Sequence, residues 1–517
     1  MYRKVISAIL VLAMVVSMLI IVKDDFNIVT DTSVNETSKN TDVPDDTIVI
    51  WCTDSALVEY ISDAALAFKK DTGTSVQIEV VDGIDYIEKI NDASISNKSS
   101  IAAPDLYITT HDSLMKAYLS GLAAPVIDRN ETIISDHFPT TALNAITCDS
   151  KIVAYPLYFE TNFFLYNKTY MSKIAENKIQ DETGAEAAVE EAQEETNQEN
   201  TENSENTDEN SDETMTEDGE VFEEDDPMGE EDAAVDQEVL ERLATMIPSK
   251  ISDVITFANN YDAPEAVEAV FKWDVTDIFY NYFFVGQYLE VGGDAGDNNA
   301  IFNLYNTSAV DCLKTYQSMN QYFTIDPEKD NYDSILQDFI DGKLVFTVAT
   351  TDAFAKIEEA QLKGNFDFDY GVAILPDISD ILLARGLSVT DVIAINGYSK
   401  KKDMADDFAA YLSYDAADTI YTKAGKLGCK RDIPYENMEI NNVMTEYQKS
   451  MPLPKMIETS NFWLQLEIAF SRVWNGEDPD AVLTELSEQM GGQIEEITYS
   501  IPVQESIGAG VQTFFTK

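Results

Sequence analysis

Apolar residues between positions 47 and 110 fall into short unbroken runs separated by segments of helical periodicity. Three runs have the length and composition of buried strands: TIVIW (47–51), SVQIEVV (75–81) and PDLYITT (104–110). Behind the first run, apolar side chains recur at helical spacing: Leu57, Ile61, Ala64 and Phe68. Gly73 follows them and is placed to cap that helix. The alternation of strands and helices predicts a parallel sheet with helices on its faces.

From residue 266 onward the pattern changes to aromatic-rich segments. A long aromatic helix is expected over 266–289, and a helix over 331–343 leads into the strand LVFTVAT (344–350). Two further strands are expected, at 369–376 and 389–395, before a mainly helical tail from residue 403. This succession predicts two α/β lobes between which the chain crosses more than once.

The start of the chain has the pattern of an export segment. The basic start MYRK precedes 18 apolar residues, from Val5 to Val22. As a helix this run would be about 27 Å long, just enough to cross a hydrocarbon core. Basic residues before it and acidic residues after it predict an exported body. No small-x-small cleavage site follows, so we expect an uncleaved membrane tether, with a cleaved signal as the alternative.

Charge excludes one class of partner. The chain has 94 acidic and 34 basic residues, a formal net charge of -60. Nucleic-acid binding requires Lys/Arg clusters that displace counterions from phosphates, and the sequence has none. We therefore expect no nucleic-acid partner.

The acidic residues concentrate in one insert. From residue 181 to residue 240 there are 26 Asp or Glu and no Lys or Arg. Such a segment buries too little apolar surface to offset chain entropy, so we predict a disordered insert over about 175–240. A calcium-binding role is the alternative, but the ligand spacing and turn glycine of an EF-hand loop are absent. We expect a surface loop whose ends lie close together.

Cysteine and histidine usage argues against metal chemistry. The four cysteines are Cys52, Cys148, Cys312 and Cys429, and they form no Cys-x-x-Cys pair. Only two histidines occur, which leaves little for a histidine-based metal site or a Ser-His triad. One or two disulfides are compatible with an exported protein, and a buried free thiol is the favoured interpretation for Cys52. No metal and no cofactor are expected.

Polar and aromatic side chains follow the predicted strands, where ligands bind in open α/β sheets. Asp112 follows the third strand, and Glu160 stands in the aromatic stretch AYPLYFETNFFLYNK. Tyr280, Tyr282 and Trp463 offer flat apolar faces. Carboxylates and aromatic rings together suit a sugar, which has a hydroxyl rim and an apolar C–H face.

Simpler structural roles compete with this interpretation. Asp112 alone could be a helix cap or turn residue, and a tyrosine at helical spacing such as Tyr280 is usually a core residue. Glu160 could instead satisfy a buried amide. No single one of these residues establishes a binding site.

Nine segments resemble extracellular solute-binding proteins of ABC importers, above all the maltose/maltodextrin-binding family. They are IVIW with FKKDTG, PDLYITTHDS with SGLAAPV, AYPLYFETNFFLYNK, YFFVGQYLEVGGD, YDSILQDFIDGK, DYGVAILP and SNFWLQLEIAFSRVWNG. Together they are spread over nearly the whole range from residue 47 to about residue 488, except the acidic insert. The resemblance implies an α/β fold of two lobes, like that of periplasmic binding proteins, with a hinge and a ligand cleft between the lobes.

The resemblance also implies site residues. The carboxylate of the HD pair and the glutamate of the YP…E block bind sugar hydroxyls in that family, which indicates Asp112 and Glu160. The aromatic residue before the GG helix end and the tryptophan of the FW pair stack on sugar rings, which indicates Tyr282 and Trp463.

Two departures from the family pattern affect the expected ligand. Thr109 and Asp352 stand where the family has further stacking tryptophans, so the series of aromatic plates is incomplete and the sugar is expected to be shorter, differently linked or more polar. With Tyr280 and Ser55, these two residues complete the expected ligand contacts. No catalytic residue is expected.

The same resemblance suggests a division of the chain. The expected segments are an N-terminal signal or anchor (1–26), a flexible linker (27–46), lobe 1 (47–158), lobe 2 with the acidic insert (159–384), a return to lobe 1 (385–428) and a helical C-terminal part mainly in lobe 2 (429–517). We expect a monomer at the extracellular face of the cell membrane, tethered there or secreted after signal cleavage.

The sequence-based hypothesis is a non-enzymatic carrier that delivers an oligosaccharide to the permease subunits of an ABC transporter. Two alternatives stay open: a binder of polyamines or cationic peptides, which the charge favours, and a glycoside hydrolase that uses a carboxylate pair such as Asp112 and Glu160. A purely structural surface adhesin is a third.

Overall fold

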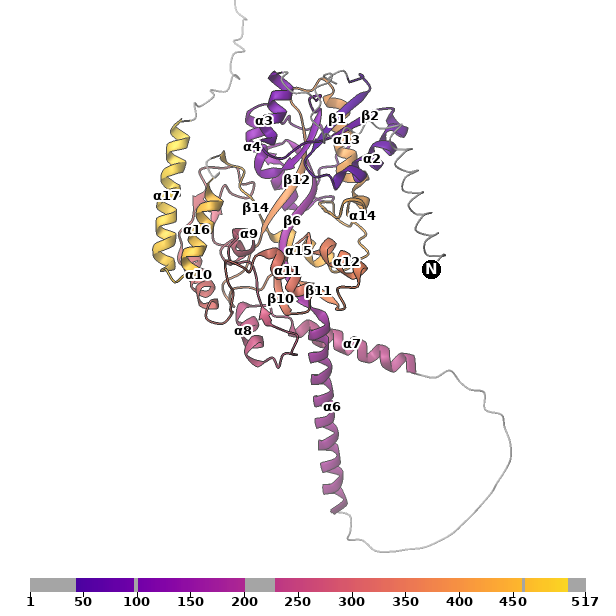
Figure 1. Ribbon diagram of the computed structural model, residues 1–517, viewed down its shortest axis with the longest axis vertical. Coiled ribbons are helices and arrows are strands. Elements are labelled where there is room, and N and C mark those ends of the chain that lie inside the picture. The colour runs from indigo at the N-terminus through magenta and orange to yellow at the C-terminus, as the bar shows by residue number, and fades with distance from the viewer. Residues whose placement is uncertain (1–42, 97–100, 200–227, 458–460, 501–517) are drawn as a thin grey trace, which may run out of the picture.

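One mixed sheet of ten strands runs through both halves of the molecule (Figure 1). The computed structural model describes residues 43–96, 101–199, 228–457 and 461–500. Along the main path the strand order is β2-β1-β3-β12-β6-β10-β7, with β11 and β13 paired to β6 and β14 paired to β12. The predicted N-terminal segment 1–26 lies outside the described residues. Within them, no helix is both long and apolar enough to cross a membrane.

The strands of the large sheet are β1 (Thr47–Cys52), β2 (Ser75–Val80), β3 (Leu106–Thr110), β6 (Ala154–Asn167), β7 (Ala269–Phe271), β10 (Leu344–Thr350), β11 (Tyr370–Ala373), β12 (Leu387–Ile395), β13 (Leu427–Gly428) and β14 (Met451–Pro452). Two small hairpins are β4 (Thr147–Cys148) with β5 (Lys151–Ile152), and β8 (Glu290–Val291) with β9 (Phe302–Asn303).

The helices in the first half are α2 (Leu57–Thr72), α3 (Tyr86–Asn91), α4 (Leu114–Leu119), α5 (Thr140–Ala145), α6 (Lys168–Glu199), α7 (Met228–Met246) and α8 (Ile251–Asn260). Those in the second half are α9 (Ile278–Asn281), α10 (Thr307–Met319), α11 (Tyr332–Ile340), α12 (Ala353–Lys363), α13 (Lys402–Ala410), α14 (Ile420–Ala424), α15 (Ile440–Lys449), α16 (Phe462–Trp474) and α17 (Pro479–Ser500).

The upper lobe in Figure 1 is built on β1, β2 and β3, which we call lobe 1 with the helices around them. β1 pairs in parallel with both β2 and β3, as the strand–helix alternation predicts. Apolar side chains of α2, α3, α4 and α13 share one core with these strands. α2 ends where predicted: Gly73 takes a left-handed φ of 81° and its N–H donates to the Lys69 carbonyl oxygen at 2.8 Å.

Two long strands connect lobe 1 to the lower part of the molecule, lobe 2. β6 and β12 are antiparallel, and their register shifts between Asp391 and Val392, which marks a β-bulge. The upper residues of β6, such as Tyr155, belong to the core of lobe 1, whereas Phe164 belongs to a core of lobe 2. In lobe 2, β6 lies between β10 and β11. A ligand between the lobes would therefore contact the middle of β6 and β12.

The expected long helix over 266–289 is wrong. The segment instead contains β7, the short helix α9 and a 3₁₀ turn at Tyr282–Phe284. Residues Ala269–Phe271 pair with β10, and Asp277 caps α9 by accepting a hydrogen bond from the Phe279 N–H at 2.8 Å. The pairing of β7 with β10 and the cap at Asp277 therefore interrupt the continuous helix that periodicity alone predicts.

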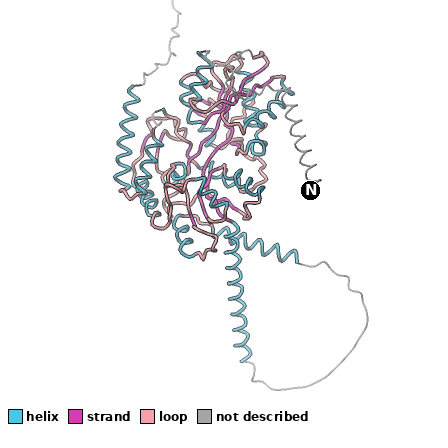
Figure 2. The backbone as a smooth tube through the Cα atoms, in the orientation of Figure 1, coloured by secondary structure: helices cyan, strands magenta, loops and turns pink. Residues whose placement is uncertain are grey.

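The prediction of disorder over 175–240 is also wrong for the described part of the insert. α6 continues to Glu199 and projects from lobe 2, and α7 returns beside its base (Figure 2). Near the body Met171 and Leu243 are buried, and the Arg242 guanidinium donates to the Glu182 carboxylate at 3.1 Å. Glu, Ala and Gln have high helix propensities. Because α6 and α7 are anchored to the body at their base, each helix extends from turns that are already formed and needs no separate nucleation. Residues 200–227 lie outside the described residues.

All four cysteines are free and buried, so the disulfides that the sequence left open are not formed. Burial raises the pKa of the Cys52 thiol to about 12, which keeps it protonated and unreactive. The expectation of a buried free thiol at Cys52 is confirmed.

Candidate functional site

A cavity of about 450 Å³ opens beside the middle of β6, between the exit of β10 and helix α9. Its lining residues are Glu160, Asp277, Phe279, Tyr280, Tyr332, Asp333, Thr350, Asp352, Lys356 and Val389. Three of the residues predicted from the sequence therefore meet there: Glu160, Tyr280 and Asp352. The volume is within the range of small-ligand sites.

Two stacked tyrosines form the aromatic part of this wall. The rings of Tyr280 and Tyr332 lie 4.8 Å apart between centroids with an interplanar angle of 22°. Tyr280 is 7% exposed, so only a small part of its ring can contact a ligand in this conformation. Offset aromatic pairs hold their rings firmly and present a preformed apolar surface.

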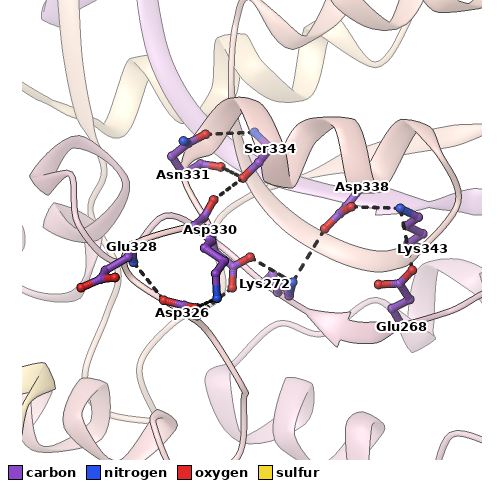
Figure 3. Close-up of polar contacts among 10 residues, drawn as sticks. Glu268, Lys272, Asp326, Glu328, Asp330, Asn331, Ser334, Asp338 and Lys343 are labelled. Atoms are coloured by element: carbon purple, nitrogen blue, oxygen red, sulfur yellow. Dashed lines mark hydrogen bonds and ion pairs between the residues drawn. The ribbon is translucent and has the colours of Figure 1, made fainter.

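Tyr332 is held in place by the start of α11. Its N–H donates to Asp274 at 2.9 Å, and Asn331 caps the helix by accepting from the Ser334 N–H at 3.0 Å. Figure 3 shows the polar network around this cap, in which Lys272 pairs with Asp330 at 3.1 Å. The network ties the loop before α11 to the segment after β7.

Asp352 is fully engaged at the exit of β10. Its Oδ1 accepts a hydrogen bond from the Tyr332 hydroxyl at 2.6 Å and another from the Thr350 hydroxyl. Its Oδ2 pairs with the Lys356 ammonium at 2.8 Å, and the same ammonium pairs with Asp333 at 2.7 Å. Lys356 thus balances part of the negative charge of two carboxylates.

Glu160 is the central carboxylate, in the middle of β6 opposite Val389 of β12. Burial is the main cause that raises the pKa of Glu160; Lys426 opposes it, and the negative charges of Asp352 and Asp54 add to it. Within the described part of the chain, no hydrogen bond or ion pair reaches its carboxylate from a side chain. A half-buried carboxylate of this kind is available to a ligand.

Sequence reasoning missed a second carboxylate beside it, Asp391 of β12. Asp391 lies opposite Tyr158 in the register and its side chain is hydrogen-bonded to the Tyr158 hydroxyl. Burial and the nearby negative charge of Glu160 raise the pKa of Asp391 to about 7, and Asp112 contributes in the same direction. The signal was present as a single charge inside the apolar run VTDVIAI.

Lys426 is the cation that sequence reasoning missed. Its ammonium pairs with Asp54 at 2.9 Å and lies 5.2 Å from the centroid of the Tyr158 ring. Its positive charge also acts on Glu160 and Asp391. Lys426 is more than 250 positions from Glu160 in the chain, and only the pairing of β13 with β6 brings them together.

Asp112 follows β3 in the 3₁₀ helix His111–Ser113, on the lobe 1 side of this charge cluster. His111 fixes that turn: its Nδ1 accepts from the Thr390 N–H at 3.0 Å, which leaves Nε2–H to donate to the Leu453 carbonyl oxygen at 3.0 Å. Burial lowers the pKa of His111 to about 4, so the ring is neutral and acts as a positioning group.

Four other predicted contacts lie apart from the cavity lining. Tyr282 is 1% exposed and packs edge-on against Trp463, with ring centroids 5.7 Å apart. Trp463, at the start of α16, is only partly buried. Thr109 is buried in β3, and Ser55 is exposed in the loop after β1. In this conformation the structure does not bring these four residues to the cavity around Glu160.

Within the described ranges, no group of three or more His, Cys, Asp or Glu side chains is arranged to hold a metal ion. Asp333 and Asp352 instead pair with Lys356, Asp352 also accepts from two hydroxyls, and Asp277 accepts from a backbone N–H. Chemically, the site offers hydrogen-bond acceptors, one paired ammonium and aromatic faces.

Solved structures show where this fold occurs. A cyclo/maltodextrin-binding protein complexed with maltotetraose matches with a TM-score of 0.63 at 18% identity, over 88% of this chain and 99% of the other. An extracellular solute-binding protein from Staphylococcus aureus in complex with maltose gives the same TM-score and identity, over 88% and 100% of the two chains. A maltotriose-binding protein from Thermus thermophilus matches with a TM-score of 0.56 at 15% identity, over 87% and 100%. These proteins share the two-lobed fold that the sequence predicts.

Sequence comparison identifies the family. No curated protein matches the sequence. The family model of bacterial extracellular solute-binding proteins matches residues 63–428, well over half of the chain. Members of that family are binding proteins rather than enzymes. With its two lobes, its crossing strands and this match, the chain belongs to the bacterial extracellular solute-binding proteins.

Proposed function

We propose that this protein binds an oligosaccharide in the cleft at β6 and β12 and presents it to the permease of an ABC importer. One observation carries the proposal: the cavity combines the Tyr280–Tyr332 stack with the carboxylate of Glu160 on a strand shared by both lobes. An aromatic face suits the C–H side of a sugar ring, and a carboxylate without an ion pair accepts hydrogen bonds from its hydroxyls. The sugars named in the similar structures support the same ligand class.

The proposed mechanism is closure by hinge bending. β6 and β12 cross between the lobes, and the bulge at Asp391 interrupts their regular pairing beside Glu160. A ligand that contacts groups from both lobes stabilises the closed arrangement more than the open one, and this difference drives closure. We retain Asp112 and Trp463 as proposed contacts that closure brings to the ligand. The N-terminal segment 1–26 is proposed to hold the protein at the outer face of the membrane, or to direct its secretion.

A thermal-shift screen tests this function. The purified protein is heated with maltose, maltotriose, other oligosaccharides, amino acids or spermidine. A ligand at a hundredfold excess over its Kd stabilises by about 2.7 kcal/mol, which is readily visible. We expect an oligosaccharide response in the wild type and its loss in Tyr280→Ala. Stabilisation by no saccharide would contradict the proposal.

A second candidate is a cationic solute such as a polyamine or a cationic peptide. Four carboxylates line the cavity against one lysine, which favours positive charge in the ligand. Affinity for such a solute falls steeply as salt is added, whereas affinity for a neutral sugar hardly changes. Binding of spermidine that weakens with salt, without any saccharide binding, would support this candidate.

A further inference from the structure

The charge balance of the cavity points to a narrower ligand class. The four lining carboxylates are Glu160, Asp277, Asp333 and Asp352, and among the described residues Lys356 is the one cation in the lining. With all groups ionised, the wall carries an excess of three negative charges. A neutral sugar could hydrogen-bond to these groups, but it would remove water from them without balancing their charge, which is costly.

Two of these carboxylates are already committed. Lys356 bridges Asp333 at 2.7 Å and Asp352 at 2.8 Å, and Asp352 also accepts from the Tyr332 hydroxyl. A ligand cation at either carboxylate would have to compete with that lysine.

The other two carboxylates have no such partner in the described part of the chain. The lysine whose charge acts on Glu160 is Lys426, which is already paired with Asp54 at 2.9 Å. Asp277 uses Oδ1 to accept from the Phe279 N–H at 2.8 Å, and no ion pair to it occurs within the described ranges. Glu160 and Asp277 therefore face the same cavity, and no cation among the described residues is bonded to either of them.

The aromatic wall limits what carries the positive charge. Phe279, Tyr280 and Tyr332 line the same cavity, and the two tyrosines are stacked. A flat apolar face pairs with a ring that has a C–H side, and an ammonium beside an aromatic ring gains further electrostatic attraction. A flexible polyamine would meet the carboxylates but would use the rings less well.

We propose that the cleft selects an oligosaccharide of amino sugars, with Glu160 and Asp277 as the partners of its protonated amino groups. This inference rests on the proposed sugar-binding function and adds the charge of the ligand to it. Hydrogen bonds between charged groups contribute about 1.5–3 kcal/mol, so loss of one such partner should weaken binding roughly tenfold to a hundredfold.

Calorimetric titration with matched sugars tests the inference. The β-1,4-linked glucosamine trimer and cellotriose differ at C2 of each ring, where an ammonium replaces a hydroxyl. Glucosamine and glucose give the same comparison between monosaccharides. We expect the glucosamine trimer to bind at least tenfold more tightly than cellotriose and to weaken as salt is added. Maltotriose and spermidine are titrated beside them.

Three variants assign the effect to residues. Glu160→Gln and Asp277→Asn keep the size of the side chain, and asparagine still caps α9. We expect each to weaken the glucosamine trimer at least tenfold. Asp311→Asn removes an exposed charge on α10, outside the cavity lining, and should leave affinity unchanged. Circular dichroism confirms that each variant is folded.

The outcomes separate this inference from the proposed function. If cellotriose or maltotriose binds as tightly as the glucosamine trimer, the amino-sugar inference is overturned and sugar binding stands. If spermidine binds and no saccharide does, or if nothing binds, both the amino-sugar inference and the proposed sugar-binding function are overturned. If the glucosamine trimer binds tightly but is unaffected by both Glu160→Gln and Asp277→Asn, the assignment of the two carboxylates is overturned.

Discussion

Asp391→Asn should make the protein more stable at alkaline pH while hardly affecting it in acid. Asp391 is 8% exposed on β12, and its pKa is raised from 3.8 to about 7, first by burial and then by the charge of Glu160. The folded state therefore holds this proton more tightly than the unfolded chain does. Stability is lost as pH rises from about 4 to about 7, because folding must then bury a charge.

The magnitude follows from the shift. About three pKa units at 1.36 kcal/mol each amount to about 4 kcal/mol, an upper value because Glu160 shares the interaction. We expect Asp391→Asn to be about 2–4 kcal/mol more stable than the wild type at pH 8 and nearly equal to it at pH 4. Asparagine can still accept the hydrogen bond of the Tyr158 hydroxyl.

The assay is urea unfolding of wild type and variant, without ligand, at a series of pH values from 4 to 8.5. The quantity compared is the difference in unfolding free energy between the two proteins at each pH. Asp311→Asn, which removes an exposed charge on α10, is the control and should show no such trend. A constant difference across the series, or a variant that is less stable at pH 8, would refute the reasoning.

Three other predictions concern the stability of the fold. Tyr332→Phe removes the hydroxyl that donates to Asp352 and should cost about 2 kcal/mol in urea unfolding; an unchanged midpoint would contradict this. Gly286→Ala places a methyl group against the carbonyl oxygen of Arg385 and should lower the free energy of unfolding by about 1–3 kcal/mol in urea. A variant as stable as the wild type would contradict this and would mean that the backbone shifts to relieve the contact. Replacing residues 184–236 by a short Gly/Ser linker should shift Tm by less than about 4 °C, because the buried Met171 and Leu243 at the base of α6 and α7 are kept; loss of folding would show that the insert is structural.

The fold was predictable where local chemistry decides structure. The apolar runs became β1, β2 and β3, and Gly73 ended α2 because its left-handed conformation suits a residue without Cβ. The helix prediction for 266–289 failed because the aromatic residues of this segment fit a helix and a buried strand equally well. Pairing of β7 with β10 decides between them, and that pairing joins residues about 75 positions apart.

The site was predictable only in part, for the same reason. Glu160 is conspicuous as a charge within an aromatic stretch, and Asp391 gives the same signal within VTDVIAI. Lys426 and Tyr332 carry no local signal, because strand pairing and the cap of α11 place them. Tyr282 is buried in this conformation, so its family position alone does not decide whether it contacts a ligand.

The distance between the lobes, measured with and without ligand, tests the central claim most directly. Spin labels on Ile84→Cys in lobe 1 and Leu362→Cys in lobe 2 replace side chains that are 71% and 90% exposed, while the four native cysteines are buried. Pulsed electron paramagnetic resonance then gives the distribution of distances between the labels. We predict that a saturating oligosaccharide shifts this distribution in the wild type and leaves it unchanged in a Tyr280→Ala background. A distribution that no oligosaccharide alters would contradict closure of the lobes around a sugar.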